Sequence, residues 1–545
     1  MTKFKTLVLF FCLLIISGVL LFGINRVERK LDVMVAENNL HFTGQIKNAP
    51  PIVVFTTVAL GSFRGLLADL LWLRATRLQD AGNYFEMVQL ANWITELQPR
   101  FSGATVFLAW NMAYNISVTC SDYSDRWRWV QEGIKLIRDK AIDYNPTDPL
   151  IYRDLAWIFQ HKMGNVMDDA NQYYKVQLAR EMSRVIGATP DWEGMAKAPA
   201  GESAFLARYP QDGELWKLLK QAGIENYGAL FAAFKKDGKL PDALLTLLQG
   251  DETLIAELEC ALRADWIYRD YRLNVPLIVE INQKYGELDW RVAESQAIYW
   301  ATMGLKMTPS HKDINCERVI TQSLQESFRN GRVLMIADDV NTITLVPNLN
   351  VVDQVIEAYE TAYRENNNAR TFYSAKINFM KDAIVTLYNY GQFKKAAELY
   401  ATLSKLEGIR LPLESFVMYQ WEEDVRDASV KQASSIISGL ISSSFSYLMY
   451  GDDDAALARD RIARYIYTSY QNNLANRPSK DRIGLSPFAQ MKREVYDGFM
   501  RSPTVPAAFK QILQAKLQQE DPEVLKEQTP TAEQLIGPLL QQPGK

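Results

Sequence analysis

The chain has 545 residues, of which 48% are hydrophobic and 23% are charged, and it contains 12 Trp, 26 Tyr and 23 Phe. This composition excludes a mainly disordered, collagen-like or disulfide-scaffold protein. The net charge of -4 supplies no basic excess for nucleic-acid binding, and the three histidines, His41, His161 and His311, argue against a His-based metal site or catalytic triad.

The first predicted element is an uncharged segment near the N-terminus. Residues 6–25 carry no charge over 20 positions, and a helix of that length, at about 1.5 Å per residue, matches a hydrocarbon core about 30 Å thick. Lys3 and Lys5 precede it, but the apolar run is longer than a usual signal-peptide core and no A-x-A-like site follows. We predict that residues 1–30 form an uncleaved signal anchor with a transmembrane helix. A cleaved signal and a buried helix of a soluble protein are the alternatives.

The charges around this segment bear on its orientation. Arg26, Arg29 and Lys30 follow the apolar run and compete with Lys3 and Lys5 under the positive-inside rule. The remainder of the chain is acidic, and an anionic membrane surface repels an acidic body. We expect a cell-envelope protein anchored in the inner membrane through residues 6–25, with the bulk of the chain extracytoplasmic, on the periplasmic side.

Beyond the anchor, apolar residues recur at spacings of three and four, which predicts an all-α fold. The clearest unit is 371–408, where two amphipathic helices meet at Gly391. Gly permits a tight turn, small Ala396 lets the second helix approach the first, and Tyr400 and Leu403 fill the groove on the same face. The segment therefore predicts a helix-turn-helix hairpin.

This hairpin resembles the tetratricopeptide repeat (TPR), a helix-turn-helix unit that stacks into a solenoid. Residues 65–99 fit the same frame through Ala75, Leu78, Gly82, Tyr84, Ala91, Ile94 and Pro99. Weaker copies occur at 103–143, 149–186, 288–329 and 433–470. Several strings, among them NPTDPLIYRDLAWIFQHKMG, look like those of poorly characterised, membrane-anchored bacterial TPR proteins. The resemblance implies a TPR-like α-solenoid and assigns no reaction.

The predicted solenoid is interrupted once and followed by a different C-terminal region. Pro and Gly punctuate short apolar stretches at 187–285, which predicts an irregular insertion of short helices. TPR-like repeats are expected on both sides of it, at 31–186 and 286–480. Residues 481–545 are expected to hold a short helix followed by a mobile tail rich in Pro and Gln.

One candidate binding segment is the aromatic stretch 105–130. Amide and aromatic side chains together suit a groove that holds a peptide backbone or a sugar while rings stack on it. The residues concerned are Trp110, Asn111, Tyr114, Asn115, Trp127 and Trp129. The alternative is structural, with the amides bridging helices and the rings filling the space between them.

A second candidate cluster follows in the next predicted repeat and includes Tyr152, Arg153, Trp157 and His161. Trp157 and His161 are four residues apart and share a helix face, and Asp168 or Asp169 on the following helix could reach His161. Such a His-Asp pair can transfer protons or bind an ion, whereas its structural role would be to fix the helix register.

No catalytic, cofactor-binding or metal-binding motif occurs in the chain, so we predict no catalytic, cofactor or metal residues. The favoured function is a noncatalytic, membrane-anchored scaffold that binds a protein partner in a bacterial envelope assembly. An envelope glycan- or peptide-binding protein is one alternative. An enzyme with an unrecognised site, in 187–285 or at His161, is the other.

Overall fold

The computed structural model describes most of the chain between residues 64 and 525, and isolated positions between 18 and 34. The described ranges are 64–98, 101–165, 168–307, 313–334, 343–425, 430–475, 485–502 and 505–525. Nearly all of the predicted anchor at 6–25, and the tail at 526–545, lie outside them. None of the helices in these ranges is both long and apolar enough to span a bilayer.

The chain divides into two compact units, Met1–Pro99 and Arg100–Lys545. In the first unit, α3 (Arg64–Asp80) packs on α4 (Tyr84–Leu97), and Ala68 and Leu97 form the core of the pair. The guanidinium of Arg74 on α3 pairs with the carboxylate of Glu86 on α4. The two helices predicted within 65–99 are therefore present.

The second unit begins with helices that are repeatedly interrupted by π-helical turns. In order they are α5 (Ser102–Trp110), η2 (Asn111–Ile116), α6 (Ser117–Thr119), α7 (Tyr123–Lys135), η3 (Leu136–Ala141), α8 (Ile142–Tyr144), α9 (Pro149–Trp157), η4 (Ile158–Gly164) and α10 (Asn171–Ile186). Asp148 begins α9 by accepting a hydrogen bond from the Leu150 N–H at 3.0 Å, and Pro149 suits the first helical position because it has no N–H to satisfy.

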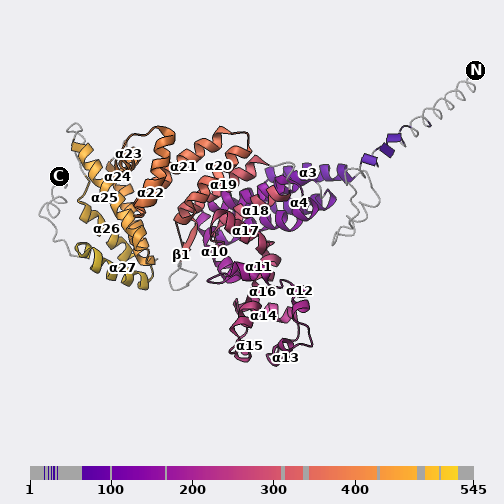
Figure 1. The fold of residues 1–545 in the computed structure, drawn as a ribbon. Helices are drawn as coiled ribbons and strands as arrows, with labels where there is room; N and C mark the ends of the chain where they lie inside the picture. Colours follow the sequence, from indigo (N-terminus) through magenta and orange to yellow (C-terminus); the bar gives the residue numbers. More distant parts are fainter. Residues whose placement is uncertain are drawn as a thin grey trace, which may run out of the picture. The chain divides into compact units, whose positions relative to one another are not determined.

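Short helices follow, as the punctuation by Pro and Gly predicts. They are α11 (Trp192–Lys197), α12 (Glu202–Arg208), α13 (Glu214–Gln221), α14 (Tyr227–Asp237) and α15 (Asp242–Leu247), and they precede the longer α16 (Glu252–Tyr271) and α17 (Val275–Tyr285). Helices α12 to α15 lie together beside α16 (Figure 1). Phe205, Trp216 and Tyr227 form their aromatic core, and the buried Tyr227 hydroxyl donates to Asp265 on α16 at 2.7 Å.

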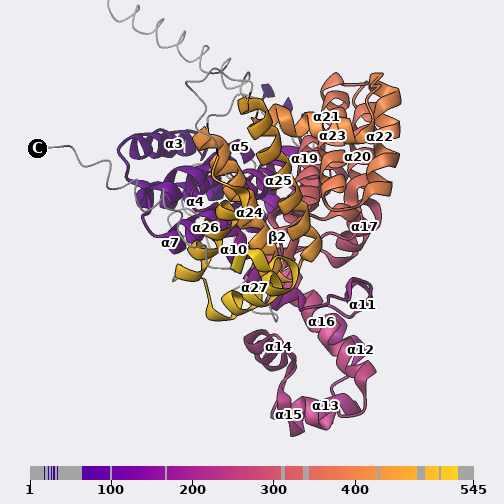
Figure 2. The ribbon, with the colours of Figure 1, turned by 90° about the vertical axis from the view of Figure 1, so that its left-hand side faces the viewer.

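The next group contains α18 (Ala293–Met307), most of whose side chains are buried. It also comprises α19 (Ile314–Asn330), β1 (Arg332–Leu334), β2 (Thr344–Val346), η5 (Leu349–Val351), α20 (Val352–Glu365), α21 (Arg370–Asn389) and α22 (Phe393–Glu407). Helix α18 packs on α9, η4 and α19, whereas β1 and β2 pair antiparallel with Val333 opposite Leu345. Figure 2 shows α20, α21 and α22 side by side, each packed on the next.

The C-terminal group continues the helical pattern. Its elements are α23 (Leu413–Val425), α24 (Val430–Tyr450), α25 (Asp453–Ala475), α26 (Phe488–Arg501), α27 (Ala507–Glu520) and η7 (Pro522–Leu525). Small residues let α24 and α25 approach closely, and the buried Ser444 hydroxyl donates to the Ala456 carbonyl at 2.8 Å. Apart from the β1–β2 pair, the described chain is helical, so the predicted all-α class is confirmed. The finer domain boundaries stay predictions.

Candidate functional site

Four aromatic side chains from two helices form a continuous row, which we call the aromatic row: Trp110, Tyr114, His161 and Trp157. Neighbouring ring centroids along it are 5.2, 5.8 and 4.8 Å apart, and the Trp110–Tyr114 and Trp157–His161 pairs are stacked. The Tyr114 hydroxyl lies 3.4 Å from Nδ1 of His161 and joins the two halves. The row thus links two segments that are about one predicted repeat apart.

The two halves of the row are built alike. In each, a regular helix ends on a Trp and a π-helical segment follows directly: α5 and Trp110 precede η2, and α9 and Trp157 precede η4. The second ring, Tyr114 or His161, comes four residues after the Trp. Trp110 and Trp157 remain 40% and 37% exposed. Because π-helical turns are often found at functional sites, this doubled arrangement marks the row as the candidate site.

Next to the row, η4 and α19 enclose a groove of about 350 Å³, which we call the amide groove. Its lining combines Trp157 and His161 with planar polar side chains: Gln160, Asn165, Gln322, Gln325, Glu326 and Arg329, together with Gly164. Gln160 holds the two walls together, because its Nε2 donates to the Val319 carbonyl at 3.2 Å and lies 3.1 Å from the Ser323 hydroxyl. Amide side chains offer donors and acceptors at once, which suits a ligand that carries both.

A buried charged pair packs against the Tyr114 ring of the aromatic row. The ammonium of Lys162, on η4, pairs with the Asp168 carboxylate and lies 5.3 Å from the centroid of the Tyr114 ring. Arg126 reaches Asp168 at 3.5 Å and Asp169 at 2.5 Å. Burial lowers the pKa of Lys162, and the hydrogen bond and charge of Asp168 oppose this. The predicted pair between His161 and Asp168 or Asp169 is therefore not formed, since Lys162 and Arg126 occupy those carboxylates.

His161 stacks on Trp157 instead. Its pKa is lowered from the usual value of 6.5, first by burial and second by the positive charge of Lys162. The imidazole is consequently neutral at pH 7, with one nitrogen able to donate and the other able to accept a hydrogen bond.

A carboxyl group lies directly behind the wall of the groove. Glu294, on α18, is fully buried, and its Oε2 has no hydrogen-bond partner among the residues that the structure describes. Burial raises the pKa of Glu294 to about 7. Gly164 is the residue that makes room for this carboxyl group, because a Cβ at that position would lie 2.7 Å from Oε1 of Glu294.

The remaining predicted residues serve packing and helix contacts. Asn111 is buried; it donates to the Phe107 carbonyl at 2.9 Å and accepts from Asn115 at 2.5 Å. Trp129 is also buried, and Trp127 donates to Glu181 at 3.2 Å. These four side chains therefore bridge and pack helices, which was the alternative to a binding role.

Tyr152 and Arg153 also contribute to the framework. Tyr152 is buried and donates its hydroxyl proton to the Pro146 carbonyl at 2.8 Å, whereas Arg153 pairs with Asp154 at 2.8 Å and lies 3.6 Å from Asp313. Of the ten predicted site residues, the row contains Trp110, Tyr114, Trp157 and His161, and only the last two line the groove.

The opposite wall of the groove was not predicted. Gln322, Gln325, Glu326 and Arg329 follow at spacings of three, four and seven on one face of α19. That polar stripe was the available signal, but it also describes an ordinary solvated helix face. Only the fold brings α19 to η4.

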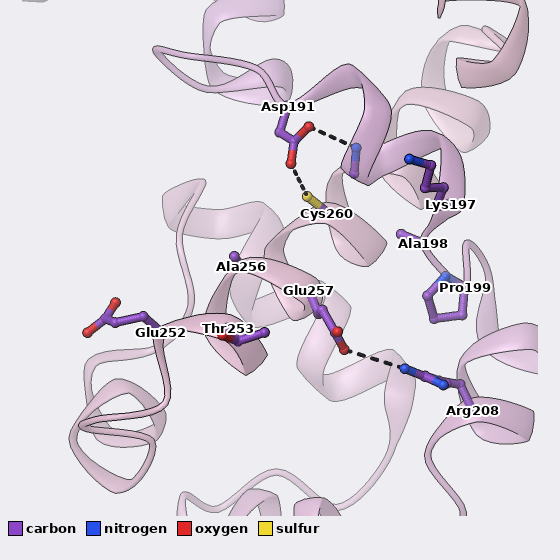
Figure 3. A pocket seen from close by; sticks show the side chains of 11 residues that line it. Asp191, Lys197, Ala198, Pro199, Arg208, Glu252, Thr253, Ala256, Glu257 and Cys260 are labelled. Carbon is purple, nitrogen blue, oxygen red and sulfur yellow. Dashed lines mark hydrogen bonds and ion pairs between the residues drawn. The ribbon is translucent and has the colours of Figure 1, made fainter.

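A larger cavity, of about 830 Å³, lies between α11, α12 and α16 (Figure 3). Figure 3 shows charges of both signs around it, with Glu257 facing Arg208 at 3.9 Å and Asp191 4.0 Å from the Cys260 sulfur. Burial, and the nearby Asp191, raise the pKa of the Cys260 thiol, so this cysteine is not an activated nucleophile. Among the described residues, no group of three or more His, Cys, Asp or Glu could hold a metal ion.

The chain matches no model of a known protein family, and it matches no curated protein. The geometry of the row and the groove is therefore the basis for assigning a function.

Proposed function

We propose that this protein is a noncatalytic scaffold, a membrane-anchored, TPR-like α-solenoid that binds a partner polypeptide in the amide groove. The observation that carries the proposal is the pairing of half-exposed rings, Trp157 and His161, with amide side chains from a second helix in one groove. Interfaces obtain most of their affinity from a few aromatic anchors and exclude water around them.

The chemistry of the groove suits an extended polypeptide. A peptide backbone presents an N–H donor and a C=O acceptor at each residue, and Gln322, Asn165 and neutral His161 can satisfy both. Trp157 offers an apolar surface for one partner side chain. The carboxylate of Glu326 and the guanidinium of Arg329 lie 3.8 Å apart, so this part of the groove carries little net charge.

The repeat architecture and the location belong to the same proposal. Its support is the succession of packed neighbours, α18 with α19, α20 with α21, α21 with α22 and α24 with α25, which is the order that stacked helix hairpins produce. The apolar segment 6–25 would tether the scaffold to a bacterial inner membrane, with the body on the periplasmic side.

The test is photo-cross-linking in intact cells with the full-length protein. We expect Trp157→p-benzoylphenylalanine to give a discrete adduct with one partner protein, and Phe393→p-benzoylphenylalanine, an exposed aromatic position on α22, to give none. Gln322→Ala should reduce the adduct, and Gln490→Ala, on α26, should not.

Affinity for the captured partner gives the second readout. Loss of an aromatic anchor typically costs about 2 kcal/mol or more, so Trp157→Ala should weaken binding by about thirtyfold. An adduct that forms equally at positions 157 and 393, or no adduct at 157, would contradict a scaffold role for this groove.

A further inference from the structure

A separate cavity of about 530 Å³ lies where three connecting segments meet, and we call it the loop cavity. Its walls come from the α10–α11 connection at 186–192, the α17–α18 connection at 286–291, and the residues around β1 and η5. The volume falls within the range of about 300–1,000 Å³ that is common for small-molecule sites. None of its lining residues belongs to the amide groove.

Two of the three walls are built alike. The α10–α11 connection reads Gly187-Ala-Thr-Pro-Asp-Trp192, and the α17–α18 connection reads Gly286-Glu-Leu-Asp-Trp290. Both glycines end a helix with φ near +80°, at 80° and 85°, a conformation that favours glycine. The two tryptophans meet edge to face at 5.9 Å. The connections thus form a matched pair around one cavity, with Trp290 buried and Trp192 half-buried.

Each of two asparagine side chains in the cavity uses one of its polar atoms in a hydrogen bond within the protein, and its other polar atom can bind a ligand. Asn282 Oδ1 accepts from the indole N–H of Trp290 at 3.0 Å, which leaves its Nδ2 as a donor. Asn348 is 3% exposed and donates from Nδ2 to the Glu287 carbonyl at 3.1 Å, which leaves its Oδ1 as an acceptor. Neither available atom has a partner among the described residues. The structure therefore holds a donor and an acceptor in place for a ligand.

The charges around the loop cavity balance. Arg291 lies bidentate on Asp289, with nitrogen to oxygen distances of 2.8 and 2.7 Å, so neither presents a free charge. Arg332 and Glu287 are exposed, carry opposite charges, and form no ion pair with other described residues. A strongly anionic or cationic ligand would find no net countercharge here.

We propose that the loop cavity binds a small neutral saccharide, with Trp192 as the stacking surface and Asn282, Asn348 and Asn350 as hydroxyl ligands. Each sugar hydroxyl both donates and accepts, which matches the available donor of Asn282 and acceptor of Asn348. The C–H face of a pyranose ring is apolar and packs on an indole ring. The balanced charges select a ligand without carboxylate, phosphate or ammonium groups.

The test is calorimetric titration of the full-length protein in lipid nanodiscs, because maltoside detergents carry a sugar themselves. The probes are glucose, galactose, mannose, N-acetylglucosamine and their 1,4-linked dimers. We expect at least one probe to bind with a dissociation constant on the order of 1 mM or tighter. Trp192→Ala should weaken that binding at least tenfold, and Asn350→Ala by a smaller factor.

Controls separate this site from the amide groove and from misfolding. Trp192→Phe keeps an aromatic ring against Trp290 and should retain partial binding. This variant therefore tests the stacking surface even if Trp192→Ala disturbs the fold. Trp157→Ala should leave saccharide binding unchanged, so this result is independent of the proposed scaffold function. The proposal is overturned if no probe binds, if binding survives Trp192→Ala unchanged, or if glucuronate or glycine binds better than every neutral sugar.

Discussion

The hairpin of α21 and α22 buries aliphatic side chains between two regular helices, whereas η2 and η4 leave aromatic rings half-exposed and bury a charged pair. In the hairpin, Ile384, Leu387, Ala396 and Leu403 have no exposed surface. In η4, Lys162 is buried beneath rings that solvent still reaches. A π-helical turn adds one residue, and each residue turns the helix by about 100°. Side chains after the insertion therefore leave the face that a regular helix would bury.

The difference separates regions built for stability from regions available for binding. The hairpin contributes apolar burial, which stabilises the fold by about 25 cal/mol per Å². The π-helical segments instead leave Tyr114 and His161 partly exposed, where they stack on Trp110 and Trp157, and a rigid framework keeps such rings in place. Lys162 and Asp168 provide part of that framework.

The largest expected change in the free energy of unfolding comes from breaking the Lys162–Asp168 pair next to the aromatic row. Lys162→Met removes one of the two cations that contact the buried Asp168 carboxylate and leaves only Arg126, at 3.5 Å; loss of a partner from a buried pair typically costs about 3–5 kcal/mol. Chemical denaturation should show this loss in the free energy of unfolding of the full-length protein. Lys135→Met is the matched control, because Lys135 forms an exposed pair with Glu132, and such pairs contribute about 1 kcal/mol or less. If the two variants lowered the free energy of unfolding equally, the buried pair would contribute no more to stability than the exposed pair.

The buried carboxyl group behind the groove predicts a pH dependence. The folded pKa of Glu294 is about 7, above the usual 4.5, so the folded state binds this proton more tightly than the unfolded state. The associated stability is fully present below about pH 4.5, falls as the pH rises, and is lost above about pH 7. At about 1.4 kcal/mol per pKa unit, the total is about 3 kcal/mol. Glu294→Gln stays neutral and should therefore be more stable than the parent protein at pH 8.

Denaturation curves between pH 4.5 and pH 8 measure this effect. The parent protein and Glu294→Gln should differ little at the acidic end and diverge towards pH 8. Glu398→Gln, on the exposed face of α22, is the control and should follow the parent curve. Parallel curves for the parent and Glu294→Gln would show that Glu294 is not the group responsible.

The smallest of the three effects concerns the regular hairpin. Ala396 has no exposed surface where α22 meets α21, and enlarging such a residue typically costs about 1–3 kcal/mol. Ala396→Leu should lower the free energy of unfolding by that amount. Ala401→Leu, at an exposed position of the same helix, should change it by about 0.5 kcal/mol or less. If Ala396→Leu were neutral, close packing between α21 and α22 would not be what stabilises the hairpin.

Hairpins with strong periodicity were predictable from the sequence. The pattern at 371–408 predicted two helices joined at Gly391, and the structure has α21 over Arg370–Asn389 and α22 over Phe393–Glu407. The pattern also placed Ala396 and Leu403 on the buried face. Local spacing is sufficient there because both partners of the packing are neighbours in sequence.

The candidate site was predictable only in part. Trp157 and His161 were expected to share a helix face, and they stack at 4.8 Å. Their polar neighbours across the groove come from α19, which lies more than 150 positions further along the chain, as the contact between Gln160 and Ser323 shows. No periodicity within one helix indicates which distant helix it will contact. The π-helical segments η2, η3 and η4 could not be recognised from the spacing of apolar residues either.

By itself, the sequence determined the all-α class, the helix pairs with clear periodicity, and the short helices where Pro and Gly recur. These follow from local backbone preferences and from which residues share a helix face. The tertiary structure decided which partners meet: Lys162 with Asp168 in place of His161, α19 with η4 across the amide groove, and Trp192 with Trp290 at the loop cavity. Such contacts depend on how distant helices pack, and packing depends on the shape and burial of the whole unit.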